Sequence, residues 1–225
     1  MSLFFDSSTL ISMAITCSLP LLRKLKQSYD GKFYITESVY GETISRAMQS
    51  LRFRYEGYRV KELIDDKIIE VYPDKHLAGD INELMNTINH TYFAEGKPLN
   101  IVQLGEMSAI IAGFEEKTDA IAVDERIARL LIENTDLLKP WLEHKLHTKV
   151  TINEETMKKW FPRVSNKFVP LRSAEFAVTA WKKGIFGDNK DVLYGLLWAL
   201  KFAGCAITEQ EIDFYMKKST HQNGQ

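Results

Sequence analysis

A strand that runs directly into an acid, near the start of the chain, is the feature that most restricts how this sequence can fold. Residues 3–11 read LFFDSSTLI. The short continuous apolar run predicts a buried strand, and the hydroxyl residues at 7–9 favour the start of a helix. Asp6 is therefore expected at the C-terminal end of a first strand. In an open α/β sheet, ligands and catalytic groups collect at that edge.

The same pattern recurs in the middle of the chain. Residues 120–123 read AIAV and predict a strand that ends at Asp124, with a helix after it. Residues 33–35 and 68–71 predict two further strands, and residues 148–152 are the candidate for a fifth. Because these strands alternate with amphipathic helices, the sequence predicts an α/β fold. Its central sheet should be mainly parallel, with about five strands flanked by helices.

Beyond the fifth candidate strand the patterns are mostly helical. Helices are expected over 173–183 and 192–203, and Thr208 and Glu211 have the spacing of a capping box that starts a last helix. The predicted organisation is an α/β domain over 1–152, a C-terminal helical extension over 153–218 and a flexible polar tail over 219–225.

Composition excludes several classes of protein. The 225 residues carry a formal net charge of −1, so any nucleic-acid surface must be local. Cys17 and Cys205 lack metal-type spacing and are expected as buried thiols in a reducing compartment. The N-terminus has no basic region before its apolar run, and no apolar run approaches the ~18 residues of a membrane span. We therefore expect a cytoplasmic protein with no membrane partner.

Carboxylates are expected to gather at one edge of the sheet. Asp6 and Asp124 both follow strands, and Glu42 and Glu106, each near the start of a helix, are candidates to join them. Like charges held together raise one another's pKa, and Mg²⁺ or Mn²⁺ relieves the repulsion. Such a site suits the attack of water on a phosphodiester. The plainer alternative is that these acids cap helices or favour helix N-termini.

Four segments in this order resemble the four acidic motifs of PIN-domain nucleases. They are residues 3–11 (LFFDSSTLI), 35–44 (ITESVYGETI), 104–112 (LGEMSAIIA) and 120–129 (AIAVDERIAR). This resemblance spans roughly the first 150 residues. A weaker one links residues 173–185, 193–203 and 204–212 to the helical tail of a PIN subgroup common in archaea and bacteria. The resemblance implies a parallel sheet flanked by helices and metal-dependent ribonuclease activity, as in the toxins of VapC-type toxin–antitoxin pairs.

The resemblance also implies roles for the acids. Asp6 would be the first metal ligand, Glu42 the second acid, Glu106 the third and Asp124 the fourth. The metal ligands would be Asp6, Glu106 and Asp124. In the family, a Ser or Thr usually precedes the fourth acid. Here Ala122 and Val123 stand there, which leaves Asp124 and Glu125 to compete for that role.

Ser108 is the second departure from the family pattern. The family helix often carries acids at the positions of both Glu106 and Ser108, and here the second is serine. About a helix axis the two positions lie about 200° apart, so they cannot both face a metal. If Ser108 faces the site, the site is one acid short.

The function that follows is a Mg²⁺- or Mn²⁺-dependent endoribonuclease with RNA as its partner. RNA processing or decay is one role, and a toxin paired with an antitoxin protein is another; PIN proteins also often form homodimers. The main alternative is a PIN fold with weakened catalysis that works as an RNA-binding or assembly module. A phosphatase with an aspartate nucleophile is a weaker alternative. The second aspartate of that family's first motif, which is the general acid, would fall at Ser8, so the general acid is missing here.

Two basic stretches are candidates for RNA binding, and aromatic residues are interleaved in both. Residues 46–61 hold five basic residues and one acid, and residues 158–183 hold seven and one. Basic side chains would hold phosphates while aromatic faces stack on unpaired bases. The alternative is a solvated helix face above ordinary core aromatics. The candidate RNA-binding residues are Arg46, Arg52, Arg54, Arg59, Lys158, Lys159 and Arg163.

Overall fold

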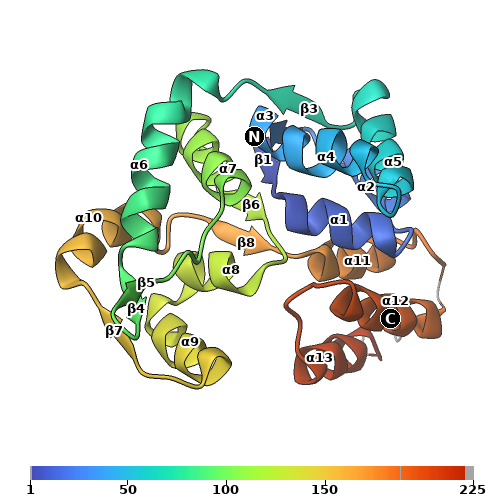
Figure 1. Ribbon diagram of the computed structural model, residues 1–225. Coiled ribbons are helices and arrows are strands. Elements are labelled where there is room, and N and C mark those ends of the chain that lie inside the picture. Colours follow the sequence, from blue (N-terminus) through green and yellow to red (C-terminus); the bar gives the residue numbers. More distant parts are fainter. Residues whose placement is uncertain (1, 188, 221–225) are drawn as a thin grey trace.

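Four strands of the central sheet lie where apolar runs predict them. The computed structural model describes residues 2–187 and 189–220. Within these residues lies a five-stranded parallel sheet in the order β3-β2-β1-β6-β8, with helices on both faces (Figure 1). The predicted α/β fold with a mainly parallel sheet is confirmed. Its strands are β1 (Ser2–Phe5), β2 (Lys32–Thr36), β3 (Glu70–Tyr72), β6 (Ala120–Ala122) and β8 (Val169–Leu171).

The fifth strand comes from a different part of the chain than expected. Residues 148–152 contain β7 (Val150–Ile152), but β7 pairs antiparallel with β4 (Tyr92–Ala94) in a separate small sheet that β5 (Lys97–Pro98) completes. The fifth central strand is β8, at the edge beside β6. Its three residues include Pro170, which an edge strand tolerates but which hides the strand pattern in the sequence. The segment after residue 152 thus contributes to the central sheet, and the division of the chain at that residue stays a prediction.

Neighbouring residues of β1 point into two separate apolar cores. Phe5 belongs to the core that includes α1 (Ser7–Ile15), α2 (Pro20–Lys26), α5 (Arg54–Asp65) and α11 (Ser173–Lys182). Phe4 belongs to the core that includes α6 (Ala78–Asn89), α7 (Leu104–Glu115), α8 (Arg126–Glu133) and α10 (Glu154–Val164). This alternation is the ordinary consequence of strand geometry, and it decides below which acids meet.

The helix expected after Thr36 is divided into three pieces. Thr36 caps it, accepting a hydrogen bond from the Val39 N–H at 3.2 Å. The pieces are α3 (Glu37–Tyr40), the π-helical turn η1 (Gly41–Ser45) and α4 (Arg46–Gln49). The remaining helical segments before the C-terminal region are η2 (Lys75–Leu77), η3 (Thr135–Leu137) and α9 (Leu138–Leu146).

The C-terminal helices α12 (Lys190–Phe202) and α13 (Glu209–Thr220) lie next to α11 (Figure 1). The predicted capping box is present, because the Thr208 N–H donates to Glu211 and the Glu211 N–H donates to the Thr208 hydroxyl. Buried Arg172 connects α11 to α13 through Glu175 at 2.6 Å and Glu211 at 2.9 Å. Of the predicted tail, residues 219 and 220 belong to α13, and residues 221–225 lie outside the described residues.

Two further expectations concern the cysteines and the membrane. Cys205 is buried as expected, but Cys17 is exposed, because it follows the end of α1 in a left-handed turn with φ 57°. None of the described helices has both the length and the apolar character needed to cross a membrane.

Candidate active site

Asp6 lies at the C-terminal end of β1 and caps α1. Its side chain is buried, at 1 % exposure, and its Oδ2 accepts hydrogen bonds from the Ser8 N–H at 3.1 Å and the Ser8 hydroxyl at 2.6 Å. Burial raises the pKa of Asp6, and these bonds only partly oppose the rise. The helix-cap alternative is therefore correct as local geometry. It leaves Oδ1 with a longer 3.4 Å contact from the Ser7 hydroxyl, so this oxygen is the more available for a ligand.

Three glutamates interact electrostatically with Asp6. Burial, and then the charge of Asp6, raises the pKa of Glu106 well above its ordinary value. Burial also raises the pKa of Glu42 and of Glu125, and in both cases the charge of Asp6 adds to the rise. These four residues, Asp6, Glu42, Glu106 and Glu125, are called the acidic cluster below. Their pKa values are displaced in the direction expected for carboxylates that repel one another in a poorly hydrated site.

Glu42 reaches the cluster from the π-helical turn η1. Its Oε1 accepts a hydrogen bond from the Gly105 N–H at 3.3 Å. A Cβ atom on Gly105 would stand 2.5 Å from Glu42 Oε2, so the Glu42 carboxylate can hold this position only beside a glycine. Single π-helical turns are frequent at functional sites. Here the turn carries an acid of the candidate site.

Glu106 is the residue of α7 that interacts with Asp6. Its Oε2 also accepts a hydrogen bond from the Gln103 N–H at 3.0 Å, closing the first turn of the helix. Ser108 is fully buried and points elsewhere, since its hydroxyl contacts Thr36 Oγ1 at 2.6 Å and donates to the Gly105 carbonyl at 2.7 Å. The serine at position 108 therefore joins α7 to the end of β2 and is not the acid-facing position.

Asp124 lies with α1 and α11. Its Oδ1 accepts from the Ser173 N–H at 2.6 Å and from Thr9 Oγ1 at 3.3 Å, and its Oδ2 accepts from the Ser173 hydroxyl at 2.6 Å. Burial raises the pKa of Asp124, and the bonds from Ser173, Ser12 and Thr9 oppose that rise. Asp124 thus ties the end of β6 to two helices. Its role as a catalytic acid or metal ligand stays a prediction.

The register of the sheet explains why Glu125, and not Asp124, meets Asp6. Phe5 is paired with Ala122, so Asp6 is level with Val123 and one residue short of Asp124. Because side chains alternate between the two faces of a strand, Asp124 turns toward α1 and α11 while Glu125 turns back. A small cavity lined by Asp6, Glu106, Val123 and Ala128 lies on the face of the sheet to which Asp6 points. Glu125 caps α8, with Oε2 accepting from the Ala128 N–H at 3.0 Å.

Ser8 joins the two strand ends that carry acids. Its hydroxyl donates to Asp6 Oδ2 and accepts from the N–H groups of Asp124 at 3.0 Å and Glu125 at 3.3 Å. The sequence indicated Ser8 as a helix-opening residue and, with Ser108 and Glu125, as a second-tier candidate for the site, but it did not predict this contact. The signal available in the sequence was a hydroxyl two residues after the first acid.

The cluster offers the donor atoms that a divalent cation needs, but its side chains are not positioned to bind one together. In the described part of the chain, no three His, Cys, Asp or Glu side chains lie close enough together to hold a metal ion. Glu42, Glu106 and Glu125 each use one carboxylate oxygen for a backbone N–H. Carboxylate oxygens are donors that Mg²⁺ and Mn²⁺ prefer, and a bound ion would relieve the repulsion among these acids. Side-chain rotation would be needed to bring their remaining oxygens to one point.

The first basic stretch lies beside the acidic cluster and has exposed aromatic rings. The charge of Arg46 opposes the rise in the pKa of Glu42, and the Arg52 guanidinium is 5.0 Å from the centre of the Phe53 ring. Arg54 and Arg59 donate to backbone carbonyls, of Met48 and Ala14 respectively, each at 3.0 Å. Among the described residues, no backbone carbonyl accepts a hydrogen bond from the side chain of Arg46 or Arg52 in this way.

The first part of the second basic stretch, with Lys158, Lys159 and Arg163, lies on α10, at the opposite side of the molecule from α4 and α5 (Figure 1). The rest of the stretch runs through β8 into α11, which packs against α1 and α2. Lys158 and Lys159 are exposed, and Arg163 pairs with Glu83 at 3.3 Å. Trp160 is fully buried and donates to Thr91 Oγ1 at 2.9 Å, so it is an ordinary core aromatic. RNA binding by either stretch stays a prediction.

Comparison with known proteins agrees with the motif order. A family model described as a PIN domain matches residues 2–138, which is more than half of the chain. The match ends at the start of α9, so β8 and the C-terminal helices lie outside it. No curated protein and no solved structure matches the chain. With the parallel sheet and the acids at its edge, the family match shows that this chain belongs to the PIN-domain family.

Proposed function

We propose that this protein is a metal-dependent ribonuclease and that the acidic cluster is its active site. The observation that carries the proposal is the position of Asp6, Glu42, Glu106 and Glu125. They come from four separate segments, yet three of them interact with the charge of the fourth. Burying unpaired acids lowers the stability of a fold, so a functional reason for the cluster is favoured over a structural one.

The cluster is proposed to bind Mg²⁺ or Mn²⁺ through Asp6, Glu106 and a third acid, with Glu42 beside them. A bound divalent ion would supply Lewis acidity and lower the pKa of a water molecule for attack on the phosphate. Ser8 orients Asp6 by donating to its Oδ2, and the Gly105 N–H orients Glu42. Arg46, beside Glu42, would hold a phosphate of the RNA. Products with 5′-phosphate and 3′-hydroxyl ends are implied by the family resemblance.

Glu125 is the better candidate for the acid contributed by the end of β6. It interacts with Asp6 and Glu106, while both oxygens of Asp124 accept hydrogen bonds from Ser173. We therefore assign Glu125 to the metal site and make Asp124 a positioning residue that holds the β6 end against α11. This assignment replaces Asp124 in the ligand set that the family resemblance implies.

Two biological roles are compatible with the proposed nuclease activity. RNA processing or decay in the cytoplasm is one role, and a toxin controlled by an antitoxin protein is the other. A homodimer is proposed from the family resemblance alone. Copurification of the protein from its native host with RNA fragments or with a small partner protein would separate the two roles.

Cleavage of a mixed RNA pool with Mn²⁺ tests the proposed activity. Wild type, Asp6→Asn and the control Asp80→Asn would be purified identically; Asp80 is exposed on α6, away from the cluster. We expect cleavage by wild type and by the control, and at least a ~100-fold loss for Asp6→Asn, since metal-ligand loss removes several kcal/mol of transition-state stabilisation. Equal cleavage by all three would mean that the activity is a contaminant.

A second candidate function is an RNA-binding or assembly module with weakened catalysis. The observation that favours it is that the acids as positioned do not converge on one point. Calorimetric titration with Mn²⁺ separates the two functions. Binding that Asp6→Asn abolishes supports the nuclease, and no binding at millimolar Mn²⁺ leaves the module.

A further inference from the structure

A pocket of about 340 Å³ adjoins the acidic cluster. It lies between α1, η1, α4 and α5, and its lining includes Ile11, Ile15, Glu42, Arg46, Phe53 and Glu56. Glu42 belongs to both the pocket and the cluster, so a group bound in the pocket would lie directly beside the proposed cleavage site. A volume near 300 Å³ is at the small end of ligand sites and suits a single ring system with its sugar.

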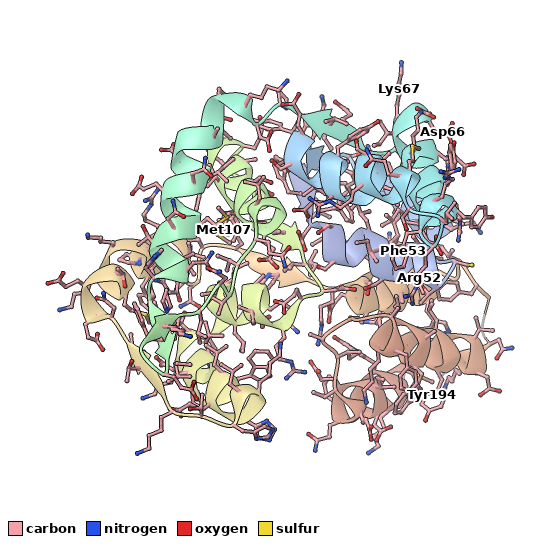
Figure 2. The ribbon with its side chains drawn as sticks, viewed as in Figure 1. Arg52, Phe53, Asp66, Lys67, Met107 and Tyr194 are labelled. Atoms are coloured by element: carbon pink, nitrogen blue, oxygen red, sulfur yellow. The ribbon has the colours of Figure 1, made fainter. Side chains whose placement is uncertain are left out.

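The walls of the pocket are apolar and partly open to solvent. Ile11 and Ile15 of α1 are 40 % and 46 % exposed, and Phe53 is 41 % exposed. Figure 2 shows Arg52 and Phe53 in the segment that joins α4 to α5, with Arg52 close to the Phe53 ring. Aliphatic walls together with one aromatic ring and a cation are the surroundings that proteins use to hold an unpaired base.

One polar atom in the pocket lacks a partner. Glu56 Oε2 is buried, and no hydrogen-bond donor reaches it among the described residues. An unsatisfied buried carboxylate oxygen is costly. Because Oε2 is buried, a ligand in the pocket reaches it only when the Glu56 side chain turns toward the pocket, and N–H donors on the ligand would favour that turn. This feature favours a ligand with donors over a purely apolar side chain of a protein partner.

We propose that the pocket binds one unpaired guanine base of the RNA, in the nucleotide next to the cleaved phosphate. The base would lie against Ile11, Ile15 and Phe53 with its Watson–Crick edge toward Glu56. Guanine presents N1–H and N2–H side by side, which matches the two oxygens of one carboxylate. Adenine and cytosine present one amino group beside an acceptor, and uracil presents one N–H between two acceptors. The proposal rests on the proposed function, because it takes the ligand to be single-stranded RNA.

Binding of short RNAs in the absence of cleavage tests the pocket. Fluorescence anisotropy would compare a short oligouridylate with the same oligomer carrying one central guanosine, adenosine or cytidine. The protein would carry Asp6→Asn, so that no oligomer is consumed. We expect the guanosine oligomer to bind about tenfold more tightly than oligouridylate, because only guanine satisfies both carboxylate oxygens.

Two variants in the same background make the result specific. Glu56→Gln is expected to abolish the preference for guanosine, because an amide offers only one acceptor oxygen. The control Glu62→Gln changes an exposed glutamate of the same helix and should keep the preference. Ile15→Trp fills the pocket and should reduce the guanosine oligomer to the affinity of oligouridylate, while circular dichroism shows that the fold is kept.

The outcomes also separate this proposal from the proposed function. Equal binding of all oligomers, or a guanosine preference that survives Glu56→Gln, overturns the base pocket even if wild type cleaves RNA. A preference for guanosine that depends on Glu56 supports the pocket even if wild type does not cleave RNA with Mn²⁺. In that case the nuclease proposal fails and the RNA-binding module stands.

Discussion

The molecule holds half-buried glutamates in two places, and their pKa values are shifted in opposite directions. In the acidic cluster, burial and the charge of Asp6 raise the pKa of Glu106. Around Arg172, burial alone would raise the pKa of Glu175 and of Glu211. The guanidinium more than reverses the effect at Glu175, and the Thr208 N–H together with the guanidinium reverses it at Glu211. The pKa of each therefore lies below its ordinary value. The difference is one cation at hydrogen-bond distance.

The consequence for stability follows from proton linkage. When a carboxyl group has a raised pKa in the folded state, its ionisation lowers the free energy of unfolding. When its pKa in the folded state is lowered, its ionisation raises the free energy of unfolding. The Arg172 group therefore holds α11 and α13 together at neutral pH, while the acidic cluster weakens the fold there. Regions that lower stability without a structural benefit are where function is expected.

Removing the Arg172 guanidinium should leave Glu175 and Glu211 without a cation, like the glutamates of the acidic cluster. Arg172→Met leaves Glu175 and Glu211 without their partner, and breaking a buried pair in this way costs about 3–5 kcal/mol of the free energy of unfolding. Urea denaturation followed by circular dichroism measures the loss. The control Lys75→Met removes an exposed pair with Glu37, at 3.5 Å, and should leave the unfolding midpoint close to wild type. Equal midpoints for the two variants would mean that Arg172 contributes nothing.

The adjacent acids Asp124 and Glu125 allow the same comparison within two residues. Asp124→Asn keeps the size of the side chain but can accept with only one oxygen where two are used by Ser173, so we expect a loss of about 1–3 kcal/mol in stability. Glu125→Gln should keep the stability and reduce Mn²⁺-dependent RNA cleavage. The reverse pattern, with a stable inactive Asp124→Asn and a destabilised Glu125→Gln, would return the ligand role to Asp124.

This pair also marks the limit of what the sequence could predict at the site. Apolar runs and capping residues are local patterns, and they correctly indicated that Asp6 ends β1 and that Thr208 starts the last helix. Which of two adjacent acids faces Asp6 depends on the register between β1 and β6, whose residues are far apart in the chain. A single sequence contains no direct signal for that register, although the absence of a hydroxyl before Asp124 left Glu125 as an alternative.

The fold shows the same limit at its edge. Four strands followed from apolar runs: the three inner strands β1, β2 and β6, and the edge strand β3. In contrast, β8 has three residues, one of them Pro170, and its pairing with β6 depends on the path of the chain through α9 and α10. A short edge strand contributes little apolar pattern of its own. Its position became evident only from the packing of the whole sheet.

Neutralising one member of the acidic cluster should raise stability while it lowers activity. Glu106→Gln removes a charge that burial and Asp6 disfavour, so we expect the free energy of unfolding at neutral pH to rise by about 1 kcal/mol. Cleavage of RNA with Mn²⁺ should fall at the same time, and Mn²⁺ should no longer raise the melting temperature. A variant that is both less stable and fully active would contradict a functional cluster.

The pH dependence of that gain sharpens the comparison. Glu106 holds its proton more tightly in the folded state, so its contribution to stability falls as pH rises from about 4.5, the ordinary glutamate value, through its raised folded pKa. The advantage of Glu106→Gln should therefore be large at neutral pH and vanish near pH 4. Glu175 and Glu211 act oppositely, because their contribution is present above about 4.5 and is lost as pH falls through their lowered pKa values. Melting temperatures of wild type, Glu106→Gln and Arg172→Met, measured from about pH 4 to neutral pH, give the pH dependence of stability for each region.

The smallest expected effect on stability comes from one methyl group at Gly105. Alanine there would place Cβ 2.5 Å from Glu42 Oε2, so the Glu42 side chain must move away from the cluster. The better helix propensity of alanine offsets part of the strain, and we expect a net change in the free energy of unfolding below about 1 kcal/mol. Gly79→Ala is the matched control, because Gly79 holds the same second position of α6 and has open space around its Cβ. If Glu42 acts at the site, Gly105→Ala should lose about tenfold in Mn²⁺-dependent cleavage, while Gly79→Ala should lose none. Equal activity in the two variants would remove Glu42 from the active site. The charge of Asp6 would still raise the pKa of Glu42 in that case.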